Sequence, residues 1–453
     1  MSLHLLQTKL SGTMTVRDDP EYEAIRSTLT FNARKPPHHP LAIIHVDHVQ
    51  DIVETVTFAR SQNLKISVRG GGHHWSGVAI QDDSLLIDLS RLNQISIDPD
   101  KRIAWVQPLV TNRELARHLA SHHLAFPTGH CPDVTLSGYL LGGGFGWNGG
   151  SWGVACWNVM AVEVVTPDGD LITASENENR EWFWAARGGG PSFFGVVTKY
   201  LLKLYPLPSH IFTSTLVYPL ESLPSLVNWL NTTTQNLPRN VETTLLLTTI
   251  PDSSTGATTK RCILSATVFA DSKSEVEHAL KPFARCDVDH QVMQDLLAPT
   301  PFETLFATID RAFPAGKRYA VDTIWSAASP TEVFSLTAEH FRQAPSEHSL
   351  ILALLLPPRP RDAPPMIDAA FSLVAPLFVA HYAIWDNEED DRTNLDWSRA
   401  LAQDLEHYCV GHYVGESDIV DSPTRLERSF STNAWKRLQE LRRKYDPRGI
   451  FDC

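Results

Sequence analysis

Two glycine-rich stretches of the sequence carry side chains that can act as nucleophiles. Residues 69–73 read Arg-Gly-Gly-Gly-His, and residues 129–132 read Gly-His-Cys-Pro. The imidazole of His73 and the thiol of Cys131 can both form covalent bonds with an electrophile. Taken singly, His73 fits an ordinary loop histidine, and Cys131 fits a small buried apolar residue, which is a common role of free cysteine. Taken together, the two stretches favour an enzyme with a bound group attached at two points.

The triple glycine follows a short β-type run at residues 65–68. Glycine adopts positive φ angles without strain, and successive backbone N–H groups without side chains can form a nest for an anion such as pyrophosphate. A plain structural turn explains the same glycines equally well. The fingerprint Gly-x-Gly-x-x-Gly, with an acidic residue about 20 positions later, is not matched. Binding of a nicotinamide dinucleotide in the usual manner is therefore disfavoured.

A second region, residues 126–157, is rich in glycine. The glycines stand at positions 129, 138, 142, 143, 144, 146, 149, 150 and 153. Such a density indicates backbone that lies against a flat or phosphorylated ligand.

Three further motifs accompany these stretches. They are the glycine turn at residues 142–146, the segment Phe-Trp-Ala-Ala-Arg-Gly-Gly-Gly that begins at residue 183, and Lys-Tyr-Asp-Pro at residues 444–447. The combination resembles the vanillyl-alcohol-oxidase and berberine-bridge-enzyme superfamily of FAD-linked oxidases. The resemblance covers residues 20–205 and 405–453. The middle third matches only in its length and in its alternation of strand-like and helical runs.

The resemblance implies FAD that is bound covalently at two points. In the family pattern, a histidine after the glycines bonds the 8-methyl carbon of the flavin, and a cysteine before proline bonds ring carbon 6. These positions correspond to His73 and Cys131, with His74 and Cys156 as the nearest alternatives. The FAD-binding residues that the resemblance implies are Arg69, Gly70, Gly71, Gly72, His73, Cys131, Val134, Thr135, Gly138, Gly142, Gly143, Gly144, Gly146, Gly195 and Val197.

The sequence departs from the family pattern where a general base is expected. Relatives carry a Tyr-x-Asn-Tyr strand where this chain has Tyr413-Val-Gly-Glu416, and many carry a tyrosine where this chain has Trp75. Either Tyr413 or Glu416 could be the catalytic base, with a pKa tuned by burial beside the flavin. Packing against the flavin also explains Tyr413, and a solvated acid at a strand end also explains Glu416.

Several aromatic residues could line a substrate site. Trp147, Trp152 and Trp157 follow one another at five-residue steps, which matches neither a helix face nor a strand alternation. They could form an aromatic wall for a ring substrate, or they could be core residues. Tyr319 and Tyr382 lie on predicted strands and carry the same two interpretations.

The elements around these motifs predict an α+β protein. Apolar spacing predicts helices at residues 49–59 and 112–124, the second with Thr111 as its N-cap. The Asp-Gly step at 168–169 predicts a hairpin between strands at 159–167 and 170–174. From residue 209 to about 400, strand-like runs alternate with helical runs, which predicts an antiparallel sheet covered by helices.

We therefore predict a two-part FAD-binding domain of the PCMH type with an inserted substrate domain. The first part spans residues 1–208, the insert of antiparallel sheet and helices spans 209–404, and residues 405–453 return to the FAD domain. The length of 453 residues supports more than one core, since single cores stop growing near ~250–300 residues. Substrate is expected between the sheet of the insert and the flavin, because ligands often bind at domain interfaces.

The composition argues against some classes of partner. A formal net charge of −13 without a basic stripe disfavours nucleic acid and anionic membranes. The amino terminus shows no basic region followed by an apolar run and a cleavage site. The six cysteines form no CxxC pair and no zinc spacing, so neither a metal site nor a disulfide framework is expected. These features predict a cytoplasmic protein.

The predicted function is that of a flavoprotein oxidase. Hydride would pass from a C–H bond of a small alcohol or amine, such as a sugar or secondary metabolite, to FAD, and dioxygen would be reduced to hydrogen peroxide. Val134 is small and would leave room for dioxygen over the ring, whereas a bulkier residue would favour a dehydrogenase. The alternatives are a dehydrogenase with another acceptor and a catalytically inert FAD-binding module.

Overall fold

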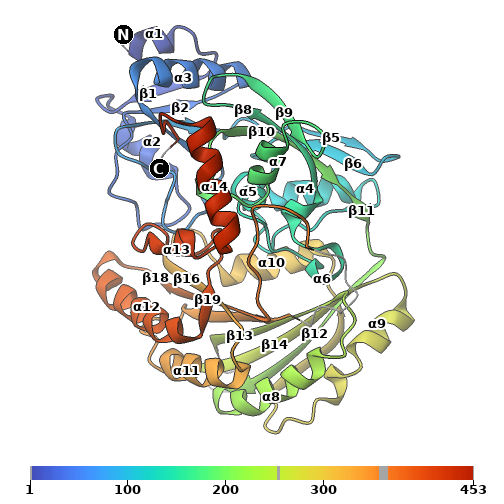
Figure 1. Ribbon diagram of the computed structural model, residues 1–453. Helices are drawn as coiled ribbons and strands as arrows, with labels where there is room; N and C mark the ends of the chain where they lie inside the picture. Colours follow the sequence, from blue (N-terminus) through green and yellow to red (C-terminus); the bar gives the residue numbers. More distant parts are fainter. Residues whose placement is uncertain (1–2, 252–255, 357–365, 452–453) are drawn as a thin grey trace.

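The computed structural model describes residues 3–251, 256–356 and 366–451. Figure 1 shows an upper part built around two sheets and a lower part built around one large sheet. Helices and antiparallel sheets occur together, so the predicted α+β class is confirmed. Among the described residues, no helix has the length and apolar character that crossing a membrane requires.

The first sheet of the upper part carries the triple-glycine turn. Its strand order is β1 (Thr13–Val16), β2 (Ala42–His45), β4 (Ser84–Asp88) and β3 (Lys65–Arg69). Strands β2, β4 and β3 are parallel, and β2 and β4 are almost entirely buried. Helix α3 (Val49–Gln62) confirms the helix predicted at 49–59, and it ends at Asn63 in the left-handed conformation, with φ of 56°. The chain then turns into β3, which ends at the glycines.

The second sheet of the upper part is antiparallel. Its order is β5 (Ile95–Asp98), β6 (Ile103–Val106), β10 (Val196–Lys203), β8 (Val159–Val165) and β9 (Leu171–Ser175). The pairing of β8 with β9 confirms the predicted hairpin. Helix α4 (Asn112–Ala120) begins at Thr111, whose side chain accepts a hydrogen bond from Glu114 N at 3.2 Å, so the predicted cap is confirmed.

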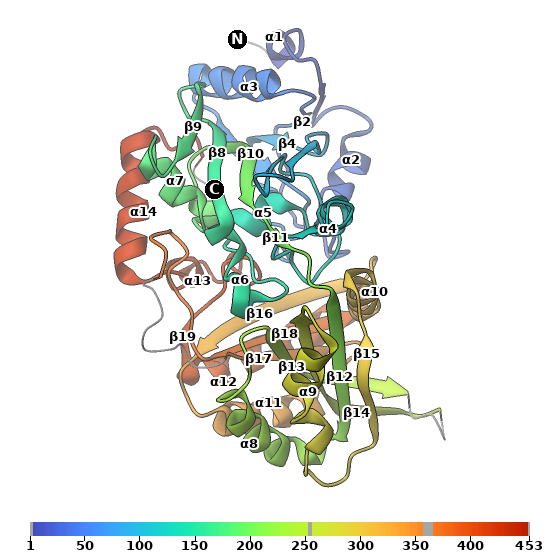
Figure 2. The same ribbon diagram turned by 90° about the vertical axis from the view of Figure 1, so that its right-hand side faces the viewer.

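The lower part is one eight-stranded antiparallel sheet (Figure 2). The predicted strands of the insert are confirmed, and the sheet gains β15 and β19, which the apolar pattern does not predict. In spatial order the strands are β15 (Met293–Pro299), β12 (His210–Pro219), β14 (Thr258–Ala270), β13 (Val241–Pro251), β17 (Leu350–Leu355), β18 (Leu377–Trp385), β16 (Arg318–Ser326) and β19 (Cys409–Gly411).

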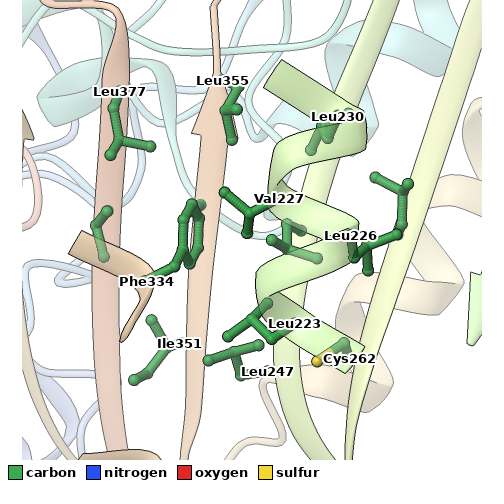
Figure 3. Packing of buried hydrophobic residues seen from close by; sticks show 14 of the residues in the cluster. Leu223, Leu226, Val227, Leu230, Leu247, Cys262, Phe334, Ile351, Leu355 and Leu377 are labelled. Carbon is green, nitrogen blue, oxygen red and sulfur yellow. The ribbon is translucent and has the colours of Figure 1, made fainter. Parts of the chain in front are cut away.

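Four helices cover the lower face of this sheet. They are α8 (Leu223–Thr234), α9 (Lys273–Leu280), α11 (Pro330–Arg342) and α12 (Asp391–Leu405). Figure 3 shows leucines of α8, such as Leu223 and Leu226, packed beside Leu247, Ile351 and Leu355 of the strands. Each fully buried leucine contributes about 1.5–3 kcal/mol relative to exposure.

Side-chain alternation turns the other face of the large sheet toward the upper part. On β18, Leu377 and Val379 belong to the helix-side core, whereas Phe378 and Tyr382 belong to a cluster that includes Val154 of the upper part. On β13 the same period of two puts Val241 and Leu245 on the helix side and therefore Glu242 on the side of the upper part. Tyr382 and Glu242 of the large sheet therefore lie on the face that is turned toward the upper part.

The chain crosses between the two parts again near its end. Strand β19 pairs with β16 of the large sheet, whereas helix α14 (Thr432–Tyr445) packs Ala434, Leu438 and Leu441 into the core of the upper part. After α14, the carbonyl of Ile450 accepts a hydrogen bond from Ile66 N at 2.6 Å. The domain limits at residues 208 and 404 stay predictions.

Candidate active site

A cavity of about 280 Å³ opens among the glycine-rich loops of the upper part. Its walls come from segments that are far apart in the sequence, from Ile66 to Phe451. The predicted site residues that line it are Gly70, Gly71, Gly72, His73, Cys131, Val134, Thr135, Gly138, Gly142, Gly195, Val197, Tyr413 and Glu416. Arg69, Gly143, Gly144 and Gly146 are not among the lining residues.

Arg69 lies behind the glycine turn and holds it in place. Its guanidinium forms a buried ion pair with Asp88 at 3.1 Å and donates hydrogen bonds to the carbonyls of Leu29 and Gly71. Gly72 has φ of 71°, and a Cβ there would lie 2.1 Å from the Leu29 carbonyl oxygen. Glycine is therefore required at this position for steric reasons.

His73 leaves this turn with its ring in a largely buried setting. The ring stacks on Phe31 with 4.8 Å between centroids. Burial, with a smaller contribution from the charge of Arg69, lowers the pKa of His73 to about 4. The imidazole is therefore neutral near pH 7, which is the nucleophilic form.

The Cys131 loop is clamped by the side chain of Asn112. The Asn112 Oδ1 atom accepts a hydrogen bond from Gly129 N at 2.9 Å, and Nδ2 donates to the Cys131 carbonyl at 3.1 Å. Burial raises the pKa of the Cys131 thiol to about 12, with a smaller effect from the charge of Glu416. Of the two alternatives to the predicted nucleophiles, His74 lines the cavity, whereas Cys156 is buried in a core cluster and does not.

Gly143, Gly144 and Gly146 allow close packing behind the cavity wall. A Cβ at Gly143 would lie 2.4 Å from the ring of Phe371, and one at Gly146 would lie 2.3 Å from the Thr128 carbonyl oxygen. Gly144 N donates a hydrogen bond to the hydroxyl oxygen of Tyr413 at 3.2 Å. These glycines shape the wall from behind.

Tyr413 and Glu416 lie in a tight turn after β19, which corrects the expectation of a strand. The N–H groups of Glu416 and Ser417 both donate to the carbonyl of Tyr413, at 3.1 and 3.0 Å. The turn brings Glu416 to the cavity wall. Both candidate bases therefore line one cavity, with Glu416 half-buried, and the role of each as a base stays a prediction.

The carboxylate of Glu416 has a phenol partner from the large sheet. Tyr382 on β18 donates its hydroxyl proton to Glu416 Oε2 at 3.0 Å. Burial raises the pKa of Glu416, whereas the Tyr382 hydrogen bond and the charge of His130 lower it in part. Burial also raises the pKa of the Tyr413 hydroxyl above its ordinary value. Glu416 is thus the more readily ionised of the two candidates.

A histidine and a glutamate that the sequence analysis did not single out form a second polar pair. His130 lines the cavity, and its Nε2 lies 2.5 Å from Glu242 Oε1 on β13. The charge of Glu242 raises the pKa of His130 against the opposing effect of burial. The only sequence signal for His130 is its place beside Cys131, and strand alternation alone does not identify Glu242 as its partner.

The tryptophan that lines the cavity is Trp75, and not one of the three tryptophans spaced five residues apart. Trp75 lines the cavity and contacts Tyr319 and Tyr382, with ring centroids 4.7 and 5.9 Å apart. Trp147 and Trp152 pack against Phe269 of the large sheet, and none of Trp147, Trp152 and Trp157 is among the lining residues. Trp147 is a buried core residue, whereas Trp152 and Trp157 are half-buried.

The chemical groups that line the cavity suit FAD. Glycine backbone at residues 70–72 offers N–H groups to a diphosphate, and a Cβ at Gly138 would project into open space. Apolar side chains, including Val68, Val134 and Leu141, suit a flat ring system. A neutral imidazole and a thiol stand on the same wall.

Comparison with known proteins gives a consistent result. A family model described as an FAD binding domain matches residues 40–175. The FAD-linked oxidoreductase penO of Penicillium crustosum is 30% identical over 437 residues, which cover 96% of this chain and 95% of that protein.

Solved structures share the fold at low sequence identity. The 6-hydroxy-D-nicotine oxidase of Arthrobacter nicotinovorans superimposes with a TM-score of 0.84 at 22% identity, over 98% of this chain and 96% of that chain. Phl p 4, a grass pollen allergen with glucose dehydrogenase activity, gives 0.83 at 20% identity, over 99% and 97%. Of two Phl p 4 variants that differ by an isoleucine-to-valine substitution, the one with valine is named a glucose oxidase and the other a glucose dehydrogenase.

The full-length similarity to a named FAD-linked oxidoreductase agrees with the glycine turns, the cavity and the two-part architecture around it. The chain belongs to the FAD-linked oxidoreductases and is an FAD-dependent oxidoreductase.

Proposed function

We propose that this enzyme is an oxidase whose FAD is bound covalently through His73 and Cys131. The observation that carries the proposal is that the side chains of His73 and Cys131 line one cavity. The neutral state of His73 supports its role as a nucleophile. Attachment at two points would hold the ring while leaving one face open to substrate.

When bound, the flavin accepts a hydride from a C–H bond of the substrate. The chain supplies the proton acceptor, for which we assign Glu416. Its carboxylate lies on the cavity wall and is oriented by the Tyr382 hydroxyl. Glu416 takes the proton of a substrate hydroxyl or amine as the hydride leaves. Trp75 lines the same cavity and supplies an apolar surface for a small organic substrate.

We assign the choice of dioxygen as acceptor to the small side chain of Val134. Val134 lines the cavity, and it lies on the loop that Asn112 clamps beside Cys131. The contrast between the two Phl p 4 variants supports the principle that one methylene can separate an oxidase from a dehydrogenase on this fold. Hydrogen peroxide is then the second product. A cytoplasmic location is part of the same proposal.

The covalent attachment is tested by mass spectrometry of denatured protein. Wild type is expected to carry one FAD, and each of His73→Ala and Cys131→Ala is expected to retain it through the remaining bond. The double variant is expected to lose it on denaturation. Wild-type protein without added mass would overturn the covalent assignment.

The oxidase assignment is tested with a panel of alcohols and amines that includes 6-hydroxynicotine and D-glucose. Anaerobic bleaching of the flavin identifies a substrate, and peroxide formed in air identifies the acceptor. Bleaching without peroxide would identify a dehydrogenase. Trp75 and Trp152, which stand where many relatives carry tyrosine, motivate the inert module as second candidate. Failure of the whole panel to bleach the flavin would favour it.

A further inference from the structure

A second cluster of reactive side chains lies outside the cavity, at the edge strand of the large sheet. Glu406 belongs to the 3-10 turn η6 (Glu406–Tyr408), Cys409 begins β19, and His412 follows that strand. Figure 1 shows β19 where the lower sheet meets the upper part. We propose that Glu406, Cys409 and His412 form a binding site for a thiophilic divalent cation, with Zn²⁺ as the best match.

The positions of the donor atoms suit one small metal ion. One donor atom from each residue, a carboxylate oxygen, Sγ and an imidazole nitrogen, lies within 4.8 Å of the other two. The distance from Cys409 Sγ to His412 Nε2 is 3.7 Å. In tetrahedral coordination, Zn–S of about 2.3 Å and Zn–N of about 2.0–2.1 Å separate these two ligands by about 3.5 Å. The observed separation therefore needs only a small adjustment.

The imidazole of His412 is oriented in the manner of a metal ligand. Its Nδ1–H donates a hydrogen bond to the carbonyl of Thr323 at 2.7 Å, and the side chain is 2% exposed. Because the proton is held on Nδ1, the lone pair of Nε2 points toward Cys409. Metal-binding histidines characteristically use the second ring nitrogen in this way.

Glu406 is the adjustable member of the cluster. Its side chain is 46% exposed and forms an ion pair with Arg428, which is itself 38% exposed. Arg428 competes with a cation for this carboxylate, so the charge of Arg428 weakens metal binding.

Binding requires the thiolate of Cys409. The thiol now donates to the Gly411 carbonyl at 3.3 Å. On binding, the S–H bond breaks, the proton passes to the buffer, and the sulfur lone pair forms the bond to the metal. No electrons are transferred, because Zn²⁺ has no accessible redox step.

The test is a titration of tag-free, FAD-loaded protein with ZnCl₂, followed by calorimetry. We expect one equivalent to bind. Zinc-edge X-ray absorption should show one sulfur at about 2.3 Å among nitrogen and oxygen ligands at about 2.0–2.1 Å. Cys409→Ser should weaken binding by about tenfold or more, since loss of outer-shell partners alone costs 10–100-fold. Arg428→Gln should tighten binding because the competing charge is removed.

Cys286→Ala is the matched control, since Cys286 is also partly exposed but lies in the helix-side core of the insert. It should bind Zn²⁺ as wild type does. Circular dichroism of each variant excludes unfolding as the cause of a loss. The proposal is overturned if wild type binds no Zn²⁺, if the absorption spectrum contains no sulfur ligand, or if Cys409→Ser leaves the affinity unchanged.

Discussion

At the scale of single residues, the groups proposed to hold FAD and the groups proposed to move protons come from different parts of the structure. His73 and Cys131 stand on the upper part, whereas Tyr382 comes from the large sheet and Glu416 from the turn after β19. A substrate between them would touch both sets. This separation allows each set to be altered without the other.

Glu416→Gln is predicted to lower kcat/KM by about 10²–10⁴, the usual contribution of a general base. In wild type, kcat/KM should rise with pH through the pKa of Glu416, because only the carboxylate accepts a proton. Tyr382→Phe removes a hydrogen bond that lowers this pKa, so the rise should move to higher pH. The measurement is the anaerobic rate of flavin bleaching against pH.

The exposed Glu178 provides the control, and Glu178→Gln should leave this profile unchanged. If the rate of flavin bleaching in the Glu416→Gln variant still falls at low pH, another group is the base. Tyr413 is then the first candidate.

Val134→Ile is predicted to slow reoxidation of the reduced enzyme by air about tenfold or more, which is at least about 1.4 kcal/mol in the barrier. The added methylene fills space on the cavity wall. The rate of anaerobic reduction should change little. Stopped-flow mixing of reduced enzyme with aerated buffer measures the effect, and Val134→Ala should retain fast reoxidation. Equal rates in the isoleucine and alanine variants would contradict the assignment.

Much of the site could be predicted from the sequence because its glycines and nucleophiles are close together along the chain. Residues 69–73 and 129–135 each form a local motif with its own backbone requirement. The pair of His130 and Glu242 could not be predicted, since its members are 112 residues apart. Tyr382 was open to two interpretations, because alternation identifies the face of a strand and not the partner across it.

At the scale of elements, the start of α4 fixes the Cys131 loop. Asn112→Ala would leave Gly129 N and the Cys131 carbonyl without their partner. Each unsatisfied buried group costs about 1–3 kcal/mol, so the free energy of unfolding should fall by about 2–6 kcal/mol. In a His73→Ala background, attachment of FAD through Cys131 should also slow. Urea unfolding and intact mass measure the two effects.

Thr111→Ala is the control for this prediction, because the Thr111 side chain caps the same helix through Glu114, whereas the Asn112 side chain holds the Cys131 loop. It should cost about 1 kcal/mol and leave the rate of attachment unchanged. Equal slowing in both variants would show that helix stability, and not the clamp, controls attachment.

Long periodic elements were the most predictable part of the fold. Helix α3 and the β8–β9 hairpin follow from apolar spacing and an Asp-Gly step. Strand β19 has three residues and β15 exposes most of its side chains, so neither carries an apolar pattern. Their places in the sheet depend on partners that lie far away in the sequence.

At the scale of the whole molecule, Asn32 joins the two parts. Its Nδ2 donates to the carbonyls of Trp75 and Tyr319 at 2.8 and 2.9 Å, and its Oδ1 accepts from Tyr319 N at 2.9 Å. Asn32→Ala is predicted to lower the free energy of unfolding by about 3 kcal/mol or more, because these buried groups lose their partner. Thermal unfolding followed by tryptophan fluorescence provides the measurement.

An exposed ion pair across the same boundary provides the contrast. Arg117 and Glu303 are 2.6 Å apart, with side chains 59% and 49% exposed. Glu303→Ala should change stability by less than about 1 kcal/mol. A larger effect from Glu303→Ala than from Asn32→Ala would contradict the view that buried hydrogen bonds hold the parts together.

Acid should destabilise the molecule through its buried neutral histidines. Burial lowers the pKa of His381 to about 3, whereas in the unfolded chain it is about 6.5. Between these values the unfolded state binds more protons, so the free energy of unfolding falls by about 1.4 kcal/mol per pH unit as pH decreases. His381→Gln should reduce that slope, whereas the exposed His122→Gln should not. Urea unfolding at pH 7, 6 and 5 tests this, and equal slopes would contradict it.

The wall that contains His73 is completed by Phe451, and the carbonyl of Ile450 pairs with Ile66. A ribosome adds about 5–20 residues per second, so roughly 20–80 s separate the synthesis of His73 from that of Phe451. During that interval a nascent chain exposes its nucleophiles without an enclosed pocket. We therefore expect FAD to be incorporated after translation, and cells starved of riboflavin should accumulate finished polypeptide that still accepts FAD later.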